Sequence, residues 1–510
     1  MLCGPVPEEF SAAWAERLVR ALPDGASDVL GRLPAELSGC LATPDHVVVF
    51  RGLASPDQIF FRTTPTSVSW STDPRDLLDG FPDFDRETLW RSCRGEDVFV
   101  YPGLGRLRPG RLAVLDARST RTERYEEATP LDLPRRTTLR DYARLTWDLL
   151  LEETRPYAAD GRRVGILLSG GVDSATVLAA LTAHGADVVA YHMGTDDPSA
   201  DESAYVHQVC DHLRVPLVTV DRATDDDYFS ADWDQPHPYN HVWRRSLERV
   251  ADRVAADGVH VLLSGLEGDT LFGPLRYGLH DVLTGDVPRR EKARMLYGLL
   301  GTRWELSRLL RSAASSYSLY ADPEALAEVE LGSDFLVAPP GAGPEAYDLD
   351  FAPQEQTLNL GLLRPRGIHL AKPLGGRRLR RLAARLPDAY RIIPYAGRTI
   401  DKPVLRLAAA DRLPPEVWRH YGRTWLGSPD ERWCLDHPDV LARILGAPDA
   451  RLTALGVVDP RRLRDVLADP RALRRNAENL LCSAMVELFL RDLETKTTRP
   501  EPQPRPVPRR

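Results

Sequence analysis

The segment Ser169-Gly-Gly-Val-Asp-Ser174 combines residue types that bind a phosphate group with a residue type that binds a metal ion. It follows the short apolar run Val164–Leu168 and precedes a helical pattern that continues to Leu181. This order predicts a buried strand that leads into a helix N-terminus. Gly170 and Gly171 allow positive φ angles there, so backbone N–H groups can approach an anion closely.

The polar side chains of the same loop refine this interpretation. Ser169 and Ser174 supply hydroxyl donors for phosphate oxygens. An aspartate repels phosphate unless a cation lies between them, so Asp173 is interpreted as a Mg2+ ligand that bridges to the phosphate. The loop lacks the Gly-Lys-Ser/Thr ending of a Walker A loop, which disfavours an NTPase that transfers the γ-phosphate. An ordinary glycine-rich turn is the simpler alternative, but the full pattern in this context favours the phosphate site.

The surrounding chain predicts the elements that hold this loop. Strand-like and helix-like segments alternate after it, at Val188–His192, Glu202–Leu213, Val215–Val220 and Val259–Leu263. Strands that alternate with helices of this length are typical of an α/β fold with a doubly wound parallel sheet. Such sheets bind ligands at the carboxyl ends of their strands, which is where the loop is predicted to lie.

The chain is predicted to contain two domains and a tail. Residues 1–130 carry short strand-like runs separated by Pro and Gly, such as His46–Arg51 and Gln58–Arg62, which predict an all-β or α+β domain. Residues 137–495 form the α/β domain, which becomes mainly helical in its C-terminal part. Residues 496–510 are rich in Pro and Arg and are predicted to be a disordered tail.

Composition disfavours several classes of function. The chain of 510 residues has a formal net charge of -8, which gives no general attraction to nucleic acid or anionic membranes, although Arg377–Arg385 is a local basic patch. No apolar run reaches the roughly 20 residues that span a bilayer, and no secretory signal is recognisable. The 6 cysteines lack metal-ligand spacing. These features predict a cytoplasmic protein that binds neither nucleic acid nor membrane.

The loop at Ser169–Ser174 resembles the pyrophosphate loop of the ATP pyrophosphatase superfamily, which cleaves ATP between its α and β phosphates. Two further segments, Tyr191–Glu202 and Leu262–Gly273, resemble the asparagine synthetase branch of that superfamily. The resemblance implies ATP and Mg2+ as cofactors. It implies nucleotide contacts at Ser169, Gly170, Gly171, Asp173, Ser174, Met193, Gly194 and Gly265, and metal ligation by Asp173 and Asp269.

Asparagine synthetases carry an N-terminal glutaminase domain whose catalytic cysteine follows the initiator Met. This chain begins Met1-Leu2-Cys3, and the part around Val48–Leu78 resembles the distal half of that domain. The resemblance therefore implies a reduced, degenerate glutaminase-like α+β domain without glutaminase activity. Since ammonia from glutamine is then not supplied, the nucleophile is expected to be an amine of the substrate.

Two families of this branch use a substrate amine, the β-lactam synthetases and the lasso peptide macrolactam cyclases. The C-terminal third is more similar to the cyclases, over Arg366–Leu374, Asp401–Leu405, Arg412–Val417 and Arg451–Asp459. The implied activity is an adenylate-forming carbon–nitrogen ligase that makes the macrolactam, or isopeptide, bond of a lasso-type ribosomal peptide in antibiotic biosynthesis. The implied partners are a leader-cleaved precursor peptide as substrate, a leader-binding protein and a protease.

The resemblance also assigns catalytic residues, with two departures from the family pattern. Lys402 is expected to contact pyrophosphate. Arg423 stands where the family has a catalytic lysine, and it keeps the positive charge but cannot exchange protons. Leu266 replaces a polar residue that faces the reaction centre, so Glu267 is the candidate to act in its place. These departures keep two alternatives open: a small-molecule amide or β-lactam synthetase, and a non-catalytic scaffold that binds ATP or peptide.

Overall fold

The computed structural model describes most of the chain in separate segments. These are residues 2–3, 16, 30, 37–42, 47–96, 98–115, 120–159, 161–195, 197–198, 200–221, 229, 235–238, 244–273, 279–300, 333–339, 357–395, 398–420 and 428–498. Within these segments, no helix combines the length and the apolar character needed to cross a membrane.

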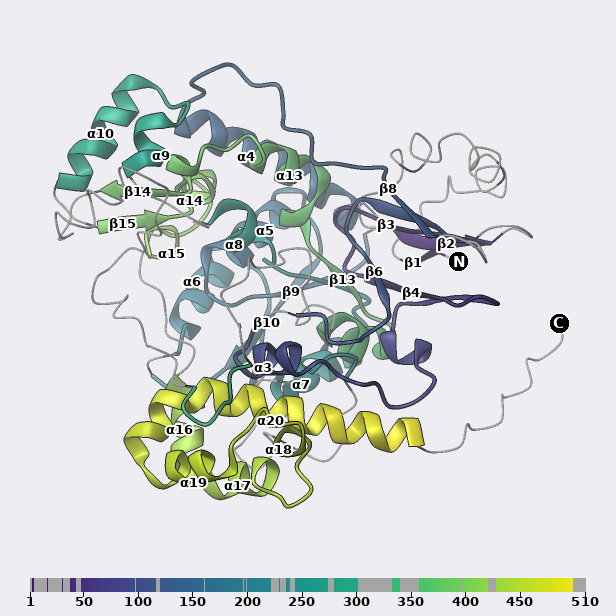
Figure 1. The fold of residues 1–510 in the computed structure, drawn as a ribbon. Coiled ribbons are helices and arrows are strands. Elements are labelled where there is room, and N and C mark those ends of the chain that lie inside the picture. The colour runs from purple at the N-terminus through teal and green to yellow at the C-terminus, as the bar shows by residue number, and fades with distance from the viewer. Residues whose placement is uncertain are drawn as a thin grey trace.

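A parallel sheet lies at the centre of the molecule (Figure 1). Its described strands follow the order β11 (Leu217–Asp221), β10 (Val188–Gly194), β9 (Val164–Leu167), β12 (Val261–Leu263) and β13 (His369–Ala371). All neighbouring strands in this order pair in parallel. The chain places β10 and β11 on one side of β9 and then crosses to the other side for β12. The strand order therefore reverses between β9 and β12, which is the position where open parallel sheets bind ligands.

Helices cover both faces of this sheet. Successive residues of a strand point to opposite faces, so one strand contributes side chains to the core on each side. One face packs against α4 (Leu139–Ala158), α5 (Val172–Ala183), α6 (Ser203–Leu213) and α14 (Pro403–Ala409). Val188 and Ala190 of β10 belong to that core. Val189 and Tyr191 of the same strand belong to a separate core with α7 (Arg244–Ala256) on the other face. The predicted α/β fold with a parallel sheet is thus confirmed.

Two antiparallel sheets make up the N-terminal part. The larger has the order β1 (Leu2–Cys3), β2 (Ser38–Ala42), β3 (Val47–Arg51), β7 (Arg111–Leu115) and β8 (Thr120–Arg124). The smaller has the order β5 (Val68–Ser71), β4 (Ile59–Thr63) and β6 (Gly105–Leu107). Val49 of the larger sheet and Ile59 and Leu107 of the smaller one share a buried cluster. The helical elements of this part whose bounds the structure describes are η1 (Pro74–Leu77) and α3 (Arg86–Cys93).

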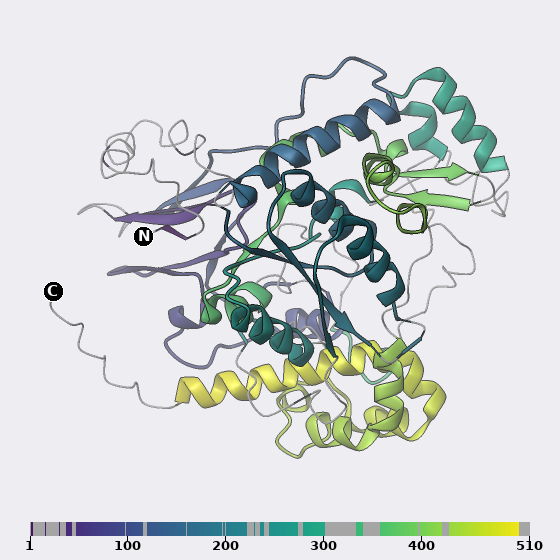
Figure 2. The same cartoon turned by 180° about the vertical axis from the view of Figure 1, so that it is seen from behind.

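The C-terminal part is helical and is continuous in its core with the N-terminal part. It contains α16 (Ser428–Asp436), α17 (Pro438–Leu445), α18 (Arg451–Ala454), α19 (Pro460–Ala468) and α20 (Pro470–Thr498). Both views show α20 as a long helix along one side of the molecule, with α3 beside it (Figures 1 and 2). Leu89 of α3 and Leu480 and Phe489 of α20 are buried in one cluster. Helix α20 passes the predicted boundary at residue 495, and residues 499–510 of the predicted tail lie outside the described part.

The remaining described elements all follow β12 along the chain. They are α8 (Gly268–Phe272), α9 (Leu279–Thr284), α10 (Arg289–Leu300), η3 (Thr357–Leu363), η4 (Arg364–Arg366), η5 (Pro373–Gly375), α13 (Arg377–Ala383), η6 (Asp388–Tyr390), β14 (Ile392–Tyr395), β15 (Arg398–Asp401) and α15 (Pro415–Trp418). Strands β14 and β15 form an antiparallel hairpin.

The basic patch at Arg377–Arg385 is engaged within the protein. Its arginines form ion pairs, namely Arg377 with Glu126, Arg378 with Glu152 and Glu153, Arg380 with Glu267 and Arg385 with Asp286. Arg381 donates from Nε to the carbonyl oxygen of Thr129 at 3.0 Å. Helix α13 therefore holds the segment that connects the N-terminal part to α4. The positive charge of the helix is largely neutralised by these ion pairs.

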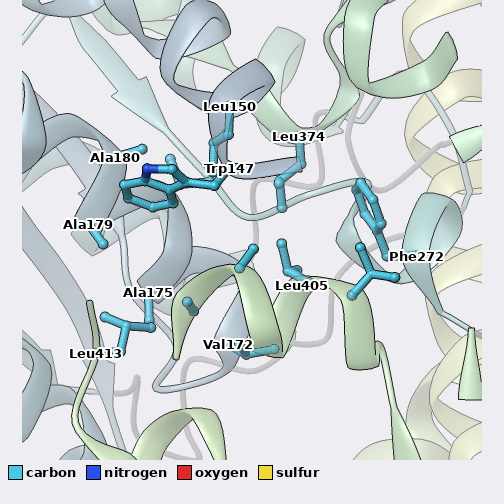
Figure 3. Close-up of a cluster of buried hydrophobic side chains, with 14 of the residues drawn as sticks. Trp147, Leu150, Val172, Ala175, Ala179, Ala180, Phe272, Leu374, Leu405 and Leu413 are labelled. Atoms are coloured by element: carbon cyan, nitrogen blue, oxygen red, sulfur yellow. The ribbon is translucent and has the colours of Figure 1, made fainter. Parts of the chain in front are cut away.

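A buried apolar cluster joins the helices that carry the candidate site (Figure 3). Trp147 and Leu150 come from α4, Val172 and Ala175 from the first turn of α5, and Leu405 from α14. Leu405 is completely buried. The N-terminal ends of α5 and α14 are consequently held close together by packing, before any polar contact is considered.

Removal of the Leu405 side chain tests this packing. Leu405→Ala is expected to lower the free energy of unfolding by about 2–5 kcal/mol, because it leaves a cavity in the shared core. Leu407→Ala on the same helix is the matched control, since Leu407 is 39% exposed; its effect should stay below about 1 kcal/mol. Urea denaturation followed by circular dichroism measures both, and equal effects would contradict the described core.

Candidate active site

The predicted phosphate loop lies between β9 and α5. Gly170 has a φ of +89°, and a Cβ at this residue would lie 2.8 Å from Cβ of Glu202. Glycine is therefore required both for the backbone angle and for space. The Ser169 and Ser174 hydroxyl oxygens lie 3.2 Å apart, and the Gly171 N–H donates to Ser169 Oγ at 3.3 Å. Gly171 caps α5, so the N-terminal N–H groups of the helix are directed to the loop.

Strand β10 supports this loop from the side. The Leu168 N–H donates to the Tyr191 carbonyl oxygen at 2.9 Å. Buried His192 lies between the loop and α6: its Nδ1 is 2.9 Å from the Leu168 carbonyl oxygen, and its Nε2 is 3.1 Å from Ser203 Oγ. Because a carbonyl oxygen only accepts, Nδ1 is the donor in the first of these contacts. Met193 and Gly194, the expected adenosine contacts, follow at the carboxyl end of β10.

A second loop, between β12 and α8, packs directly on the first turn of α5. A Cβ at Gly265 would lie 2.5 Å from the Ser174 nitrogen. A Cβ at Gly268 would lie 2.5 Å from Cγ of Asp173. Neither position leaves space for a side chain, so these two glycines fix the second loop against the phosphate loop. Asp269, the next residue, is thereby carried to the same place.

Three predicted residues meet where the two loops touch. The Lys402 ammonium nitrogen is 2.5 Å from Oδ2 of Asp173 and 2.8 Å from Oδ1 of Asp269. Lys402 is 7% exposed and adopts a left-handed φ of +48° just before α14. Lys402, which is expected from the sequence to contact pyrophosphate, thus lies beside the phosphate loop.

Burial governs the electrostatics of this group. Burial raises the pKa of Asp173, and the charge of Asp269 adds to the rise while Lys402 opposes it. Burial by itself would lower the pKa of Lys402, but the carboxylates of Asp173 and Asp269 raise it above its ordinary value. The lysine is therefore an ammonium ion at neutral pH. Oδ1 of Asp173 is buried and makes no hydrogen bond within the described part of the chain.

These two carboxylates suit a Mg2+ ion that shares its coordination with phosphate. Among the described residues, no group of three or more His, Cys, Asp and Glu side chains is placed to hold a metal ion. Mg2+ takes oxygen ligands, keeps several waters and is commonly bound by one or two carboxylates together with substrate phosphates. The pair Asp173 and Asp269, with one buried carboxylate oxygen lacking a partner, fits that pattern.

Glu267 occupies a different environment from the one its predicted catalytic role requires. Its carboxylate is 3.2 Å from the Lys372 ammonium and 2.7 Å from the Arg380 guanidinium. Burial would raise its pKa, but these two cations together lower the pKa of Glu267 to about 2. A carboxylate held so firmly in its charged form is a poor proton acceptor near neutral pH. Leu266 is 38% exposed, and Arg423 lies outside the described residues.

The ion pairs of Glu267 also hold a strained backbone, because this residue has a left-handed φ of +75°. Lys372 and Arg380 were not anticipated from the sequence. They are far from Glu267 along the chain, and the only available signal was the Ala-Lys-Pro segment around Lys372. Together these residues stiffen the second loop and so position Gly265, Gly268 and Asp269.

The ion pairs of Glu267 predict a pH-dependent contribution to stability. Because its pKa falls from 4.5 to about 2 on folding, this contribution is complete above pH 4.5 and is lost as the pH falls through about 2. Glu267→Gln should therefore cost about 1–3 kcal/mol at pH 7, and the difference from the wild type should shrink between pH 4.5 and pH 2. Urea midpoints measured against pH give both values.

Glu152→Gln is the matched control for that measurement. Its side chain is 44% exposed and pairs with Arg378 at 2.8 Å, so its loss should cost less than about 1 kcal/mol. A pH-independent effect of Glu267→Gln, or one no larger than that of the control, would contradict the buried ion pairs.

The chain is similar to known proteins over much of its length. The family model described as asparagine synthase matches residues 148–359 and 361–491, which is more than half of the chain. The microcin J25-processing protein McjC of Escherichia coli is 26% identical to this chain over 117 residues, which make up 22% of this chain and 23% of that protein. The match thus spans less than a quarter of the curated relative's length. By the extent of the family match, the chain belongs to the asparagine synthase family of ATP-dependent, amide-forming ligases.

Proposed function

We propose that this protein adenylates a carboxylate of a peptide and joins it to an amine of the same peptide, closing a macrolactam ring of the lasso type. The observation that supports this most directly is the meeting of Lys402, Asp173 and Asp269 beside the phosphate loop, where the strand order of the sheet reverses. That position is the usual ligand site of such sheets. Membership of the asparagine synthase family supplies the ATP-dependent chemistry.

The first step is attack of a substrate carboxylate oxygen on the α-phosphorus of ATP. A new carbon–oxygen–phosphorus link forms, the bond between the α-phosphorus and the bridging oxygen breaks, and pyrophosphate leaves. The N–H groups of the phosphate loop and the Lys402 ammonium are placed to take up the negative charge of the leaving group. Bound Mg2+, held by Asp173 and Asp269, would supply further charge neutralisation to the pyrophosphate.

The second step is attack of an amine on the carbonyl carbon of the acyl-adenylate. The amide bond forms, AMP leaves with the former carboxylate oxygen, and the amine proton passes to a base. Arg423 is proposed to stabilise the oxyanion, for which a permanent positive charge suffices. Glu267 is proposed as a positioning residue, because its pKa is held at about 2. Holding both ends of one peptide in the site would raise their effective concentration and favour ring closure.

Two observations favour a peptide substrate over a small molecule. The C-terminal segments resemble lasso peptide cyclases, and the curated relative McjC is named for processing microcin J25. On this basis we propose a leader-cleaved precursor peptide as substrate and a leader-binding protein and a protease as partners in the cytoplasm. A small-molecule amide or β-lactam synthetase and a non-catalytic scaffold remain the outcomes that an experiment has to separate.

Measurement of pyrophosphate release distinguishes the peptide cyclase from the small-molecule synthetase and the scaffold. The protein is incubated with ATP, Mg2+ and a leader-free candidate peptide, and pyrophosphate is measured together with the mass of the peptide. Wild-type protein should release pyrophosphate only when the peptide is present and should give a product lighter by one water. Asp173→Ala should lower the rate by at least about a hundredfold, because it removes a metal ligand beside the leaving group.

Three further outcomes distinguish the cyclase from its alternatives. Arg423→Ala should retain pyrophosphate release but lose ring closure, since the adenylate then hydrolyses. Pyrophosphate release with small carboxylates and without any change in the peptide would favour the small-molecule synthetase. Binding of ATP without pyrophosphate release under any of these conditions would contradict the enzyme and leave the scaffold.

A further inference from the structure

The Lys402 ammonium lies between the two carboxylates that the proposed function assigns to a metal ion. Its nitrogen is 2.5 Å from Asp173 and 2.8 Å from Asp269. The ammonium contacts Oδ2 of Asp173 and Oδ1 of Asp269, while Oδ1 of Asp173 makes no hydrogen bond within the described residues. A metal ion held by the same two carboxylates would therefore share its counter-ions with the ammonium and be repelled by its charge. Each cation would weaken the binding of the other.

The backbone of Lys402 is fixed, so exchange must involve its side chain alone. The Lys402 N–H donates to the Arg391 carbonyl oxygen at 2.9 Å, and the Lys402 carbonyl oxygen accepts from the Arg406 N–H at 3.0 Å. The left-handed φ of +48° sets the direction in which the side chain leaves the backbone. Beyond that point the four-carbon stem of lysine can rotate, which moves the ammonium group without moving α14.

Because Lys402 is buried, its ammonium group needs another anionic partner when it separates from Asp173 and Asp269. The Lys402 side chain is 8% exposed, so separating it from both carboxylates without a replacement anion is costly. The proposed phosphate site lies directly beside the ammonium, because Asp173 itself belongs to the first turn of α5, which Gly171 caps. A polyphosphate bound there would offer Lys402 a new partner and would offer a metal ion additional oxygen ligands. The Asp269 side chain is 72% exposed, so the carboxylate pair is open to solvent on that side.

We infer that Lys402 competes with the divalent metal for Asp173 and Asp269, so that the metal binds tightly only together with a polyphosphate that takes over the lysine ammonium. This inference rests on the proposed function for the identity of the metal site. It gives Lys402 a second role besides contact with pyrophosphate. It keeps Asp173 and Asp269 neutralised before nucleotide arrives and makes metal and nucleotide enter together.

Binding of Mn2+ alone tests the competition, with free Mn2+ measured by electron paramagnetic resonance and no nucleotide present. Lys402→Met removes the competing charge, so its affinity for Mn2+ should exceed that of the wild type by at least about tenfold. Lys402→Arg keeps the charge and should bind Mn2+ as weakly as the wild type. Combining Lys402→Met with Asp173→Asn removes a ligand and should abolish the gain.

The rise in melting temperature on adding Mn2+ is the second readout, because a ligand of the folded state stabilises it. Lys402→Gln is included in case the methionine variant does not fold, and both neutral variants should show a larger rise than the wild type. Wild-type protein that binds Mn2+ as tightly as the neutral variants would overturn the inference. If the neutral variants gain Mn2+ affinity but the wild type never releases pyrophosphate, the proposed function fails and the competition stands.

Discussion

The ammonium group of Lys402 lies between the carboxylates of Asp173 and Asp269, and the arrangement of three chain segments depends on this contact. Asp173 comes from the first turn of α5, Asp269 from α8, and Lys402 from the residue before α14. A buried charge that loses its partner is destabilising, so each of the three segments constrains the other two. The apolar cluster around Leu405 brings α5 and α14 close enough for the contact to form.

Close approach of backbone is the second constraint on the site. Gly265 and Gly268 permit the loop after β12 to lie directly on the first turn of α5, where a Cβ would collide. The same loop is tied to β13 through the Ser264 N–H, which donates to the Ala371 carbonyl oxygen at 3.0 Å. The ion pairs of Glu267 hold it from the opposite end. The site is therefore built on rigid elements from both sides of the point where the strand order reverses.

The sequence predicts those parts of the site that are encoded locally. Strand β9, the phosphate loop and α5 follow one another directly in the sequence, so the strand, the loop and the helix can be predicted without a structure. Contacts between distant segments are not encoded in that way. Strand β13 has only 3 residues, too few for an alternating pattern. The shared core of α3 and α20 joins opposite ends of the chain.

The contacts of Glu267 are another feature of the site that its neighbours in the sequence do not predict. Its place beside Leu266 suggested a role at the reaction centre, but a neighbour in sequence does not fix where a side chain points. Its left-handed backbone and its pairing with Lys372 and Arg380 direct the carboxylate to two cations from a distant segment. Lys402, in contrast, is expected from the sequence to contact pyrophosphate, and its ammonium lies beside the phosphate loop, between Asp173 and Asp269. The contact with pyrophosphate itself stays a prediction.

The proposed reaction cleaves ATP at the α-phosphorus through attack by a substrate carboxylate, with Lys402, Asp173 and Asp269 beside the leaving pyrophosphate. Transfer of oxygen-18 from a peptide labelled in its reacting carboxyl group tests this reaction. AMP should then carry one labelled oxygen for each ring closed, detected by mass spectrometry. Unlabelled AMP, or ADP and phosphate in place of AMP and pyrophosphate, would contradict it.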